Sequence, residues 1–557
     1  MRIAVGFTTG AFAACTISVF GALAVGTLTP ALAWLSLLAG ALLGLLAARQ
    51  TAAEPAPGPR FWDWAAGLLF AAVSLRSFLW LLFEANGELF IQSRYNLGDL
   101  ALHLNFIQYF ASGAPFWPES PIFQGEPLRY PIGPDLFNSL LLLAGVPLQP
   151  GLVWAGLIGA GLTAHALWRW GGAFGVASLL MVGGLAGISF FHTGILADYL
   201  AHMEWKNPFL SLLVPQRAFL FALPAGLILL QHWRRLLSGE PGRLPRWVEV
   251  LLYAAMPLFS VHTFLFLSGA LLLRFWIHRN SRASALRCVA IAFVPATILV
   301  WLVSGGFGGK SFIGWHPGWM QSGNPWAFWF WNFGLMIPLM VGAVIVATRE
   351  RDRAAAPFVF AGAFFFLLCG FVRFSPWPWD NTKLMLWSWV AMAPFIWKKL
   401  LLPLPVWGRA GVCGVLFFTG FLSLLGAMGS ENRFSFARVD ELHAAEAAVQ
   451  AIPPAARFVI KPDYNHPLLL LGRPVVCGYD GHLWSHGYDY GAKYEAAEAA
   501  MRGQISWPEA AKAFDFDYVF SGPREEAAYG QSAEPMPQVI PKTELISDGG
   551  FIEPAPP

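Results

Sequence analysis

Two pairs of an aspartate and a histidine, each at helical spacing, are the residues best suited to chemistry in this sequence. Asp99 and His103 lie four positions apart in YNLGDLALHLNFIQYF, and Asp198 and His202 repeat the spacing in HTGILADYLAHMEWKNP. Residues four apart share one face of a helix, so each pair can supply a general base with a proton partner, or two metal ligands. The alternative for Asp99 is a helix cap, with His103 exposed. The alternative for the second pair is a set of ordinary solvated loop residues.

Further ionisable residues follow the second pair. Glu204 is two positions beyond His202, and Arg217 stands at the start of an apolar run in PQRAFLFALP. A guanidinium there is costly without an anionic partner, which a phosphate would provide; the alternative is that Arg217 extends toward lipid headgroups. In WPWDNTKLMLWSW, Asp380 and Lys383 form either a structural ion pair or part of a phosphate site.

These residues are embedded in a strongly apolar chain. It has 557 residues, of which 56% are hydrophobic, 15% aromatic and 12% charged, whereas about 25% are charged in a typical soluble domain. Apolar runs long enough to cross a bilayer recur up to about residue 428, so we predict an all-α polytopic membrane protein. The net charge of +3 is too small to indicate a nucleic-acid partner. Of the five cysteines only Cys477 is in a polar region, so we expect no disulfide framework.

The positions of basic residues around the apolar runs predict the topology. Two runs do not fit whole spans: 132–148 is predicted to be a helix near the outer surface, and 248–275 a re-entrant hairpin of half-helices broken around Pro257–Thr263. The predicted extracytoplasmic parts are 86–129, 192–208, 305–325, 374–381 and the tail from 429. The first span is predicted to be an uncleaved membrane helix and not a signal peptide. The remaining runs give about 11 predicted spans: 3–25, 28–47, 61–85, 151–168, 172–191, 212–232, 288–304, 326–348, 356–373, 381–397 and 410–428.

Three regions follow from this pattern. Residues 1–60 form an N-terminal transmembrane hairpin with a cytoplasmic linker, and 61–428 hold the remaining membrane helices. In 429–557, helix-like stretches alternate with short β-like runs, which predicts a small extracytoplasmic α/β domain with a mostly parallel sheet.

The chain resembles the GT-C superfamily of membrane glycosyltransferases, including bacterial members. The resemblance rests on an acidic residue in the first large outer loop, a surface helix after it, a second ionisable outer loop, many spans and a C-terminal extracytoplasmic domain. The segments GDLALHLNFIQYFASGAPFWPESPIFQGEPLRYPIG and LLGRPVVCGYDGHLWSHGYDYGAKY carry it at the residue level. The hairpin at 3–47 is an addition to the family pattern. The first loop also contains no Asp-x-Asp pair, which leaves a metal requirement open.

The resemblance implies that 61–428 is the catalytic domain of a bacterial inner-membrane enzyme. It would transfer a sugar from a polyprenyl phosphate or pyrophosphate to an acceptor hydroxyl on the extracytoplasmic face, with inversion. Asp99 is then the base, and a divalent cation, Mg or Mn, would bind to Asp99 and Glu204 if one is used. The other expected catalytic residues are His103, Asp198 and Glu204, and those expected to bind the donor phosphate are Arg217, Lys383 and His202.

Aromatic and histidine side chains are the candidates for substrate binding, because aromatic faces next to hydrogen-bonding groups suit sugar rings. His262 falls in the predicted helix break, and Lys310 and His316 lie in a Gly- and Trp-rich outer loop. The tail loop GYDGHLWSHGYDYG either covers the site or is a Gly-rich turn with polar caps, and its two histidines make a zinc site a minor alternative. The residues assigned to substrate binding are Tyr130, His262, His316, His482, Trp484 and His486.

The expected partners are the lipid-linked donor, a glycan, lipid or protein acceptor, and membrane lipids. One alternative is a transporter or flippase of a lipid-linked glycan, which predicts inverted repeats and ionisable residues near the bilayer centre. The other is a non-catalytic assembly partner built on the same scaffold.

Overall fold

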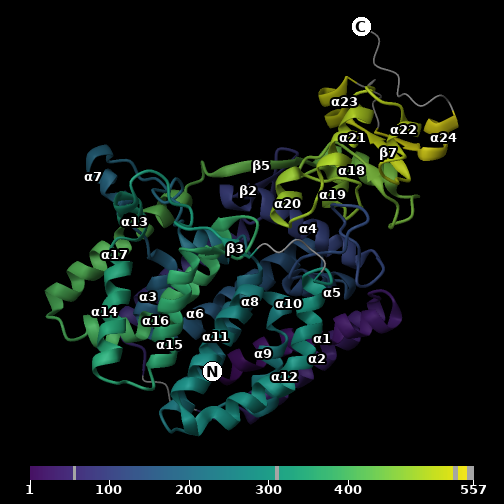
Figure 1. Cartoon of the computed structure of the whole chain (residues 1–557). Coiled ribbons are helices and arrows are strands. Elements are labelled where there is room, and N and C mark those ends of the chain that lie inside the picture. Colours follow the sequence, from purple (N-terminus) through teal and green to yellow (C-terminus); the bar gives the residue numbers. More distant parts are fainter. Residues whose placement is uncertain (54–57, 308–312, 531–536, 548–557) are drawn as a thin grey trace.

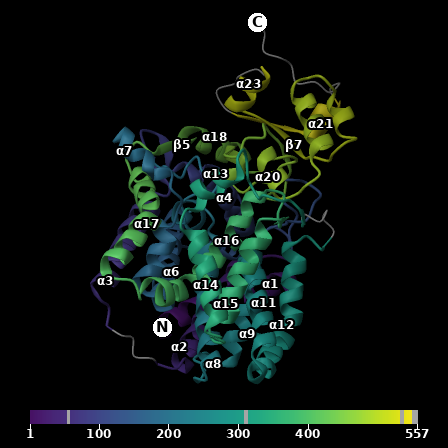
Figure 2. The ribbon, with the colours of Figure 1, turned by 60° about the vertical axis from the view of Figure 1, so that its left-hand side comes forward.

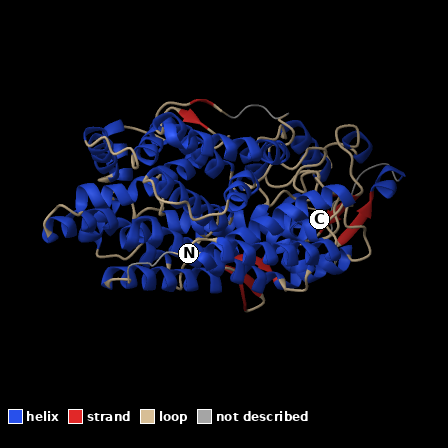
Figure 3. Cartoon of the chain, turned by 90° about the horizontal axis from the view of Figure 1, so that it is seen from below, coloured by secondary structure: helices blue, strands red, loops and turns tan. Residues whose placement is uncertain are grey.

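The computed structural model describes residues 1–53, 58–307, 313–530 and 537–547. Figure 1 shows a helical bundle with a smaller C-terminal part above one end of it. Seen from below in Figure 3, the molecule is almost entirely helical, with a few short strands. Lys310, which belongs to one of the predicted outer loops, lies outside the described residues.

The N-terminal helices α1 (Arg2–Val25) and α2 (Pro30–Gln50) form a tight hairpin. Glycines occupy their contact: a Cβ added to Gly44 would lie 2.5 Å from the carbonyl oxygen of Gly6. Small residues at such positions let two apolar helices approach closely. The hairpin packs on α5, α8 and α9, so it is part of the bundle. The predicted division into three domains stays a prediction.

Helix α3 (Phe61–Leu79) packs against α6 (Leu148–Met181), which includes the predicted span at 151–168 and the first part of that at 172–191. Its helix is interrupted at Gly172, with φ 60° and ψ −154°. A Cβ on Gly175 would lie 2.8 Å from the carbonyl oxygen of Leu167, so the chain reverses at this point. The second limb ends at Met181, shorter than predicted, and is followed by a short 3₁₀ turn and α7 (Phe190–Thr193).

The segment predicted to be a broken hairpin consists of α9 (Arg246–Ala254), α10 (Met256–Phe259) and α11 (Val261–Ile277). The break falls at Ser260, within the predicted interval, and the Ser260 side chain accepts a hydrogen bond from the Thr263 amide (3.2 Å). Such a cap satisfies a free N–H group at the start of α11. The neighbouring helices are α8 (Ala218–Leu237) and α12 (Arg282–Val303).

The remaining bundle helices include one strongly bent pair, α13 and α14, whose axes differ by 84°. Five described helices are long and apolar enough to cross a membrane, or six if this bent pair is one span, so the chain is an integral membrane protein. The predicted number of about 11 spans stays a prediction, because several of them correspond to shorter or broken helices. The helices are α13 (Pro325–Phe333), α14 (Met336–Arg349), α15 (Ala356–Cys369), α16 (Thr382–Ile396) and α17 (Val406–Ala427).

The chain between α3 and α6 contains a hairpin of β1 (Phe83–Ala85) and β2 (Glu88–Gln92), then α4 (Leu97–Ala111) and α5 (Gly133–Leu143). The predicted surface helix at 132–148 is therefore α5, but it is packed against α4 and α2 and is not on a free surface. Strand β5 (Arg433–Arg438), at the start of the tail, pairs antiparallel with β2.

The tail forms a three-stranded sheet with the order β6-β7-β8, surrounded by short helices (Figure 2). Strands β6 and β7 are parallel and β7 and β8 antiparallel, so the sheet is mixed and not mostly parallel as predicted. The strands are β6 (Phe458–Val459), β7 (Tyr518–Ser521) and β8 (Gln538–Pro541). The helices are α18 (Val439–Val449), α19 (Pro467–Leu470), α20 (Asp480–Ser485), α21 (Gly491–Met501), α22 (Trp507–Ala510), α23 (Pro523–Tyr529) and α24 (Lys542–Ser547).

Backbone hydrogen bonds attach the tail to the first outer loop. The Val475 amide donates to the Pro121 carbonyl (2.9 Å), and the Gly478 amide donates to the Ile122 carbonyl (2.8 Å). The Asn105 side chain of α4 donates to the Leu469 carbonyl (2.8 Å). The tail is therefore held over α4, and residues from both can contribute to one site.

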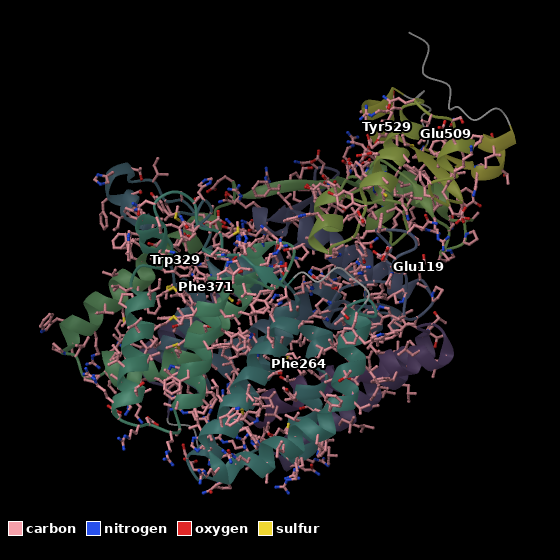
Figure 4. All side chains as sticks on the ribbon, viewed as in Figure 1. Glu119, Phe264, Trp329, Phe371, Glu509 and Tyr529 are labelled. Carbon is pink, nitrogen blue, oxygen red and sulfur yellow. The ribbon has the colours of Figure 1, made fainter. Side chains whose placement is uncertain are left out.

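Basic residues gather at the opposite end of the bundle. The turns between α8 and α9, α11 and α12, α14 and α15, and α16 and α17 all carry arginine or lysine. Figure 4 shows side-chain nitrogens along this lower edge, below Phe264. This charge asymmetry supports the predicted topology, in which the basic end is cytoplasmic.

Cysteine labelling tests that topology. Single cysteines at Glu119, His202 and Ser430 are expected to react with an impermeant maleimide from one side of the membrane, and a cysteine at Arg279 from the other. Few native cysteines need to be replaced before labelling, since only Cys413 of the five is not buried. Labelling at His202 from the Arg279 side would contradict the placement of the second outer loop.

Candidate active site

Helix α4 presents Asp99 and His103 one turn apart. The N-cap residue of α4 is Asn96, whereas the Asp99 Oδ2 accepts a hydrogen bond from the Gln216 Nε2 (2.9 Å) before α8. His103 is 2% exposed. The alternative of a helix cap with an exposed histidine is therefore wrong, and both side chains point into the protein.

His103 is paired with a residue that the sequence analysis did not single out. Its Nδ1 lies 2.8 Å from Oδ1 of Asp135 on α5, and both side chains are buried. A carboxylate only accepts hydrogen bonds, so Nδ1 carries the hydrogen and Nε2 is left to face another group. Asp135 lies in the first helical turn, where an acid is an ordinary feature, and its sequence context therefore gives no functional signal.

Lys383 and Asp380, at the start of α16, form an ion pair with Nζ and Oδ1 2.8 Å apart. Asp380 also accepts a hydrogen bond from the Ser375 hydroxyl (2.8 Å). His262, at the start of α11, interacts electrostatically with both members of the pair, and its buried Nε2 has no hydrogen-bond partner among the described residues. The predicted ion pair is thus present, and the lysine remains about 15% exposed.

The tail contributes His482 and His486 to the same place, where α20 lies directly above α4 in Figure 1. The His486 ring centre is 5.2 Å from that of Tyr130, which in turn is 6.1 Å from that of His103. His482 also makes a hydrogen bond with the backbone of Gly98, which joins α20 to the start of α4.

Burial determines the protonation of the two tail histidines. Together with the charge of neighbouring imidazoles, it lowers the pKa of His482 to about 4 and that of His486 to about 3. Both rings are therefore neutral at pH 7. They can give and accept hydrogen bonds to a sugar or an acceptor, but they do not supply positive charge.

Asp99 is in an environment that suits a general base. Burial raises its pKa above the usual value, and the Asp380 carboxylate raises it further. His103, Lys383 and the hydrogen bond from Gln216 act in the opposite direction. A carboxylate with a raised pKa accepts a proton more readily than an exposed one.

The pH dependence of activity should report this shift. Activity that needs ionised Asp99 is expected to fall, as pH decreases, at a higher pH than an ordinary aspartate gives. In D380N this acid limb should move to lower pH, because Asp380 raises the pKa of Asp99. Profiles of kcat/KM against pH measure it, with the exposed-residue variant D440N as control. An unmoved limb in D380N would contradict the coupling.

The second outer loop is placed differently. The Asp198 Oδ2 accepts a hydrogen bond from the Tyr95 hydroxyl (2.8 Å), and His202 is exposed. Glu204 interacts with Lys206, and its backbone carbonyl accepts from the Trp379 indole (2.9 Å). This loop thus supports the segment before Asp380, and Asp198 and Glu204 interact with groups other than Asp99.

Three further predicted residues differ from one another in their contacts and exposure. The His316 Nε2 lies 2.8 Å from the Trp319 carbonyl, beside the short strand β3 (Gly314–Trp315). Trp484 on α20 is 45% exposed. Arg217 is 1% exposed and donates to the Leu152 carbonyl (3.1 Å), so it does not extend toward headgroups.

The residues do not fit the expected divalent cation. Within the described ranges, no group of three His, Cys, Asp or Glu side chains is arranged to hold a metal ion. Asp99 is bound by Gln216, whereas Glu204 interacts with Lys206. Mg or Mn stays a prediction, and the mechanism proposed below does not depend on it.

Ionisable residues also lie inside the bundle, toward its basic end. The Glu249 Oε1 accepts a hydrogen bond from the Trp233 indole (2.8 Å), and the His232 Nε2 lies 3.7 Å from Glu249 Oε2. Arg274 is 1% exposed and interacts electrostatically with Glu249. Buried ionisable side chains therefore occur at both ends of the bundle.

No family model matches the chain, and no curated protein matches it in sequence. Among solved structures, it is similar to the Archaeoglobus fulgidus oligosaccharyltransferase in the apo form, with 14% identity and a TM-score of 0.41 over 83% of this chain and 70% of that chain. It is also similar to ArnT from Cupriavidus metallidurans in the apo state, with 12% identity and a TM-score of 0.44 over 86% of this chain and 98% of that chain. A further match is AglB from Archaeoglobus fulgidus in complex with an inhibitory peptide and a dolichol-phosphate, with 13% identity and a TM-score of 0.40 over 83% of this chain and 69% of that chain.

The Archaeoglobus oligosaccharyltransferase and ArnT are both GT-C membrane glycosyltransferases, the superfamily that the sequence resembles. The identities are below 15% and the TM-scores below 0.5. These similarities therefore assign neither an activity nor a substrate to this chain.

Proposed function

We propose that the protein transfers a sugar from a polyprenyl phosphate or pyrophosphate to an acceptor hydroxyl at the extracytoplasmic face of a bacterial inner membrane. The observation that carries the proposal is the convergence of Asp99 with Lys383 and His103. A base and cationic or hydrogen-bonding groups meet at the end of a membrane bundle, beneath the tail. A hydroxyl acceptor requires the base, and a departing lipid phosphate requires the cation.

The transfer is a single displacement. Asp99 takes the proton from the acceptor hydroxyl as its oxygen bonds to the anomeric carbon. The bond from that carbon to the phosphate oxygen breaks, and its electron pair leaves with the lipid phosphate. Lys383 neutralises this charge, and the configuration at the sugar is inverted. The neutral His482 and His486, with Tyr130, line the place for the sugar and acceptor.

Arg217 has a different role in this proposal from the expected phosphate contact. It is buried, and it interacts electrostatically with the Asp135 carboxylate. Two of its guanidinium nitrogens, Nε and Nη1, and the Asp135 Oδ2 have no hydrogen-bond partner among the described residues. Arg217 thus balances the buried charge of Asp135, which in turn orients His103.

The assay is release of polyprenyl phosphate from a polyprenyl-phosphate sugar by the full-length protein in proteoliposomes. Transfer to an added hydroxyl acceptor supports the proposal, and the absence of turnover with any phosphate or pyrophosphate donor would contradict it. Movement of an intact lipid-linked glycan across the vesicle membrane without bond cleavage would favour the flippase alternative.

Asp135 should affect this activity through His103. We expect D135N to lower kcat by about tenfold or more, because its amide can present the wrong partner to the Nδ1 hydrogen and turn the ring. A KM close to that of the unmodified protein would separate this effect from donor binding. The exposed-residue variant D440N, which makes the same chemical change far from the pair, is the control. Unchanged kcat in D135N would show that the pair is only structural.

A further inference from the structure

We infer that a groove at the basic end of the bundle binds one anionic phospholipid, with an acyl chain in the groove and the phosphate on Arg246. The groove has a volume of about 600 Å³ and lies between α1, α9 and α12. Its walls are almost entirely apolar and include Thr16, Val250, Leu251, Ala254, Ile291 and Pro295. Since the chain is an integral membrane protein, hydrocarbon is the surrounding medium on this face.

The length of the groove matches one leaflet. It follows α9, whose nine residues span about 14 Å. This is about half of the hydrocarbon core of a bilayer, which is about 30 Å thick. It begins at Arg246 at the basic end of the bundle and extends toward the middle as far as Ala254, the last residue of α9. A single acyl chain of that leaflet therefore fits along it.

The charges at its mouth select the headgroup. Arg246 is exposed and forms no hydrogen bond or ion pair through its guanidinium with the described part of the chain. The Trp247 indole donates to the Gln50 side chain (2.7 Å), which brings the end of α2, with the exposed Arg49, beside the start of α9. Two arginines next to an indole at the membrane surface suit a phosphate at headgroup depth.

The site differs from the candidate active site in position and composition. Asp99 and Lys383 lie at the other end of the bundle, at the start of α4 and of α16. The groove is also limited to one leaflet, whereas a polyprenyl chain is much longer than one acyl chain. The observations therefore favour a phospholipid of the membrane over the proposed sugar donor.

Native mass spectrometry of the full-length protein in neutral detergent tests the inference, with phosphatidylglycerol and with phosphatidylcholine of the same chains. We expect one phosphatidylglycerol to bind more tightly than phosphatidylcholine. R246Q should weaken its binding about fivefold, the factor that corresponds to about 1 kcal/mol per basic residue near an anionic surface. The matched control R279Q changes an exposed arginine at the same end and should leave binding unchanged.

Filling the groove gives a second, independent measurement. V250W should abolish retention of phosphatidylglycerol even with Arg246 in place, while L272W, at an exposed position of α11, should not. Equal affinities for the two lipids, or equal effects of R246Q and R279Q, would overturn the inference. So would tighter binding of a polyprenyl phosphate, or a dimer that V250W dissociates. No sugar donor is present, so failure of the proposed transfer reaction leaves this result unaffected.

Discussion

D99N is expected to lower sugar transfer by about 10²- to 10⁴-fold, the range that general-base catalysis supplies. The asparagine oxygen can still accept the hydrogen bond that Gln216 gives to Asp99 (2.9 Å). The amide cannot take up a proton at neutral pH, so the structure is retained while the reaction is lost. Release of polyprenyl phosphate in proteoliposomes measures the change.

The control is D440N, at an exposed carboxylate of the tail that is bonded to Arg438. It should retain the activity of the unmodified protein, and both variants should unfold at the same temperature. Near-normal turnover by a correctly inserted D99N protein would remove Asp99 from the reaction.

K383M is expected to lower kcat by about 10²- to 10³-fold, the usual cost of losing one group that stabilises developing negative charge. The charge on the leaving phosphate appears as the bond to the sugar breaks, so the loss should be larger in kcat than in KM. Single-turnover rates with a saturating donor separate the two.

K383M also leaves Asp380 without its ionic partner, which can lower stability. The double variant K383M/D380N removes both charges, and its amide can still accept the hydrogen bond from Ser375. We expect it to regain the unfolding temperature of the unmodified protein and to stay inactive. Recovery of activity in the double variant would show that Lys383 serves only to hold Asp380.

Hydropathy predicted most of the helical framework, because crossing helices must be long and apolar. The predicted runs at 3–25 and 410–428 correspond closely to α1 and α17. The run at 172–191 was predicted too long. The chain leaves the helix at Met181, and a Cβ on Gly184 would overlap the Trp331 carbonyl, so packing against α13 determines the end.

Other errors came from partners far along the chain. The run at 61–85 was predicted to be a single span, yet α3 ends at Leu79 and the following residues form the hairpin of β1 and β2. Its pairing with β5 involves residues about 350 positions later, such as Arg438 opposite Glu88. Local hydropathy contains no information about that pairing.

In the candidate site, too, local spacing predicted some residues, whereas others depend on distant parts of the chain. Asp99 and His103 stood out through their spacing, and the structure brings Lys383, His262 and the tail histidines to them. Asp135 was missed because an acid in a first helical turn is unremarkable, and Gln216 because a neutral amide carries no signal. The spacing of Asp198 and His202 matched that of the first pair, but Tyr95 binds Asp198 and His202 stays exposed.

The pairing of β2 with β5 also has a consequence for biogenesis. A ribosome that adds about 5 to 20 residues per second needs roughly 20 to 70 s to go from one strand to the other. During that interval β2 has a free strand edge, which is a site for incorrect association. Assembly of this protein should therefore be sensitive to translation speed and to chaperones that shield the nascent loop.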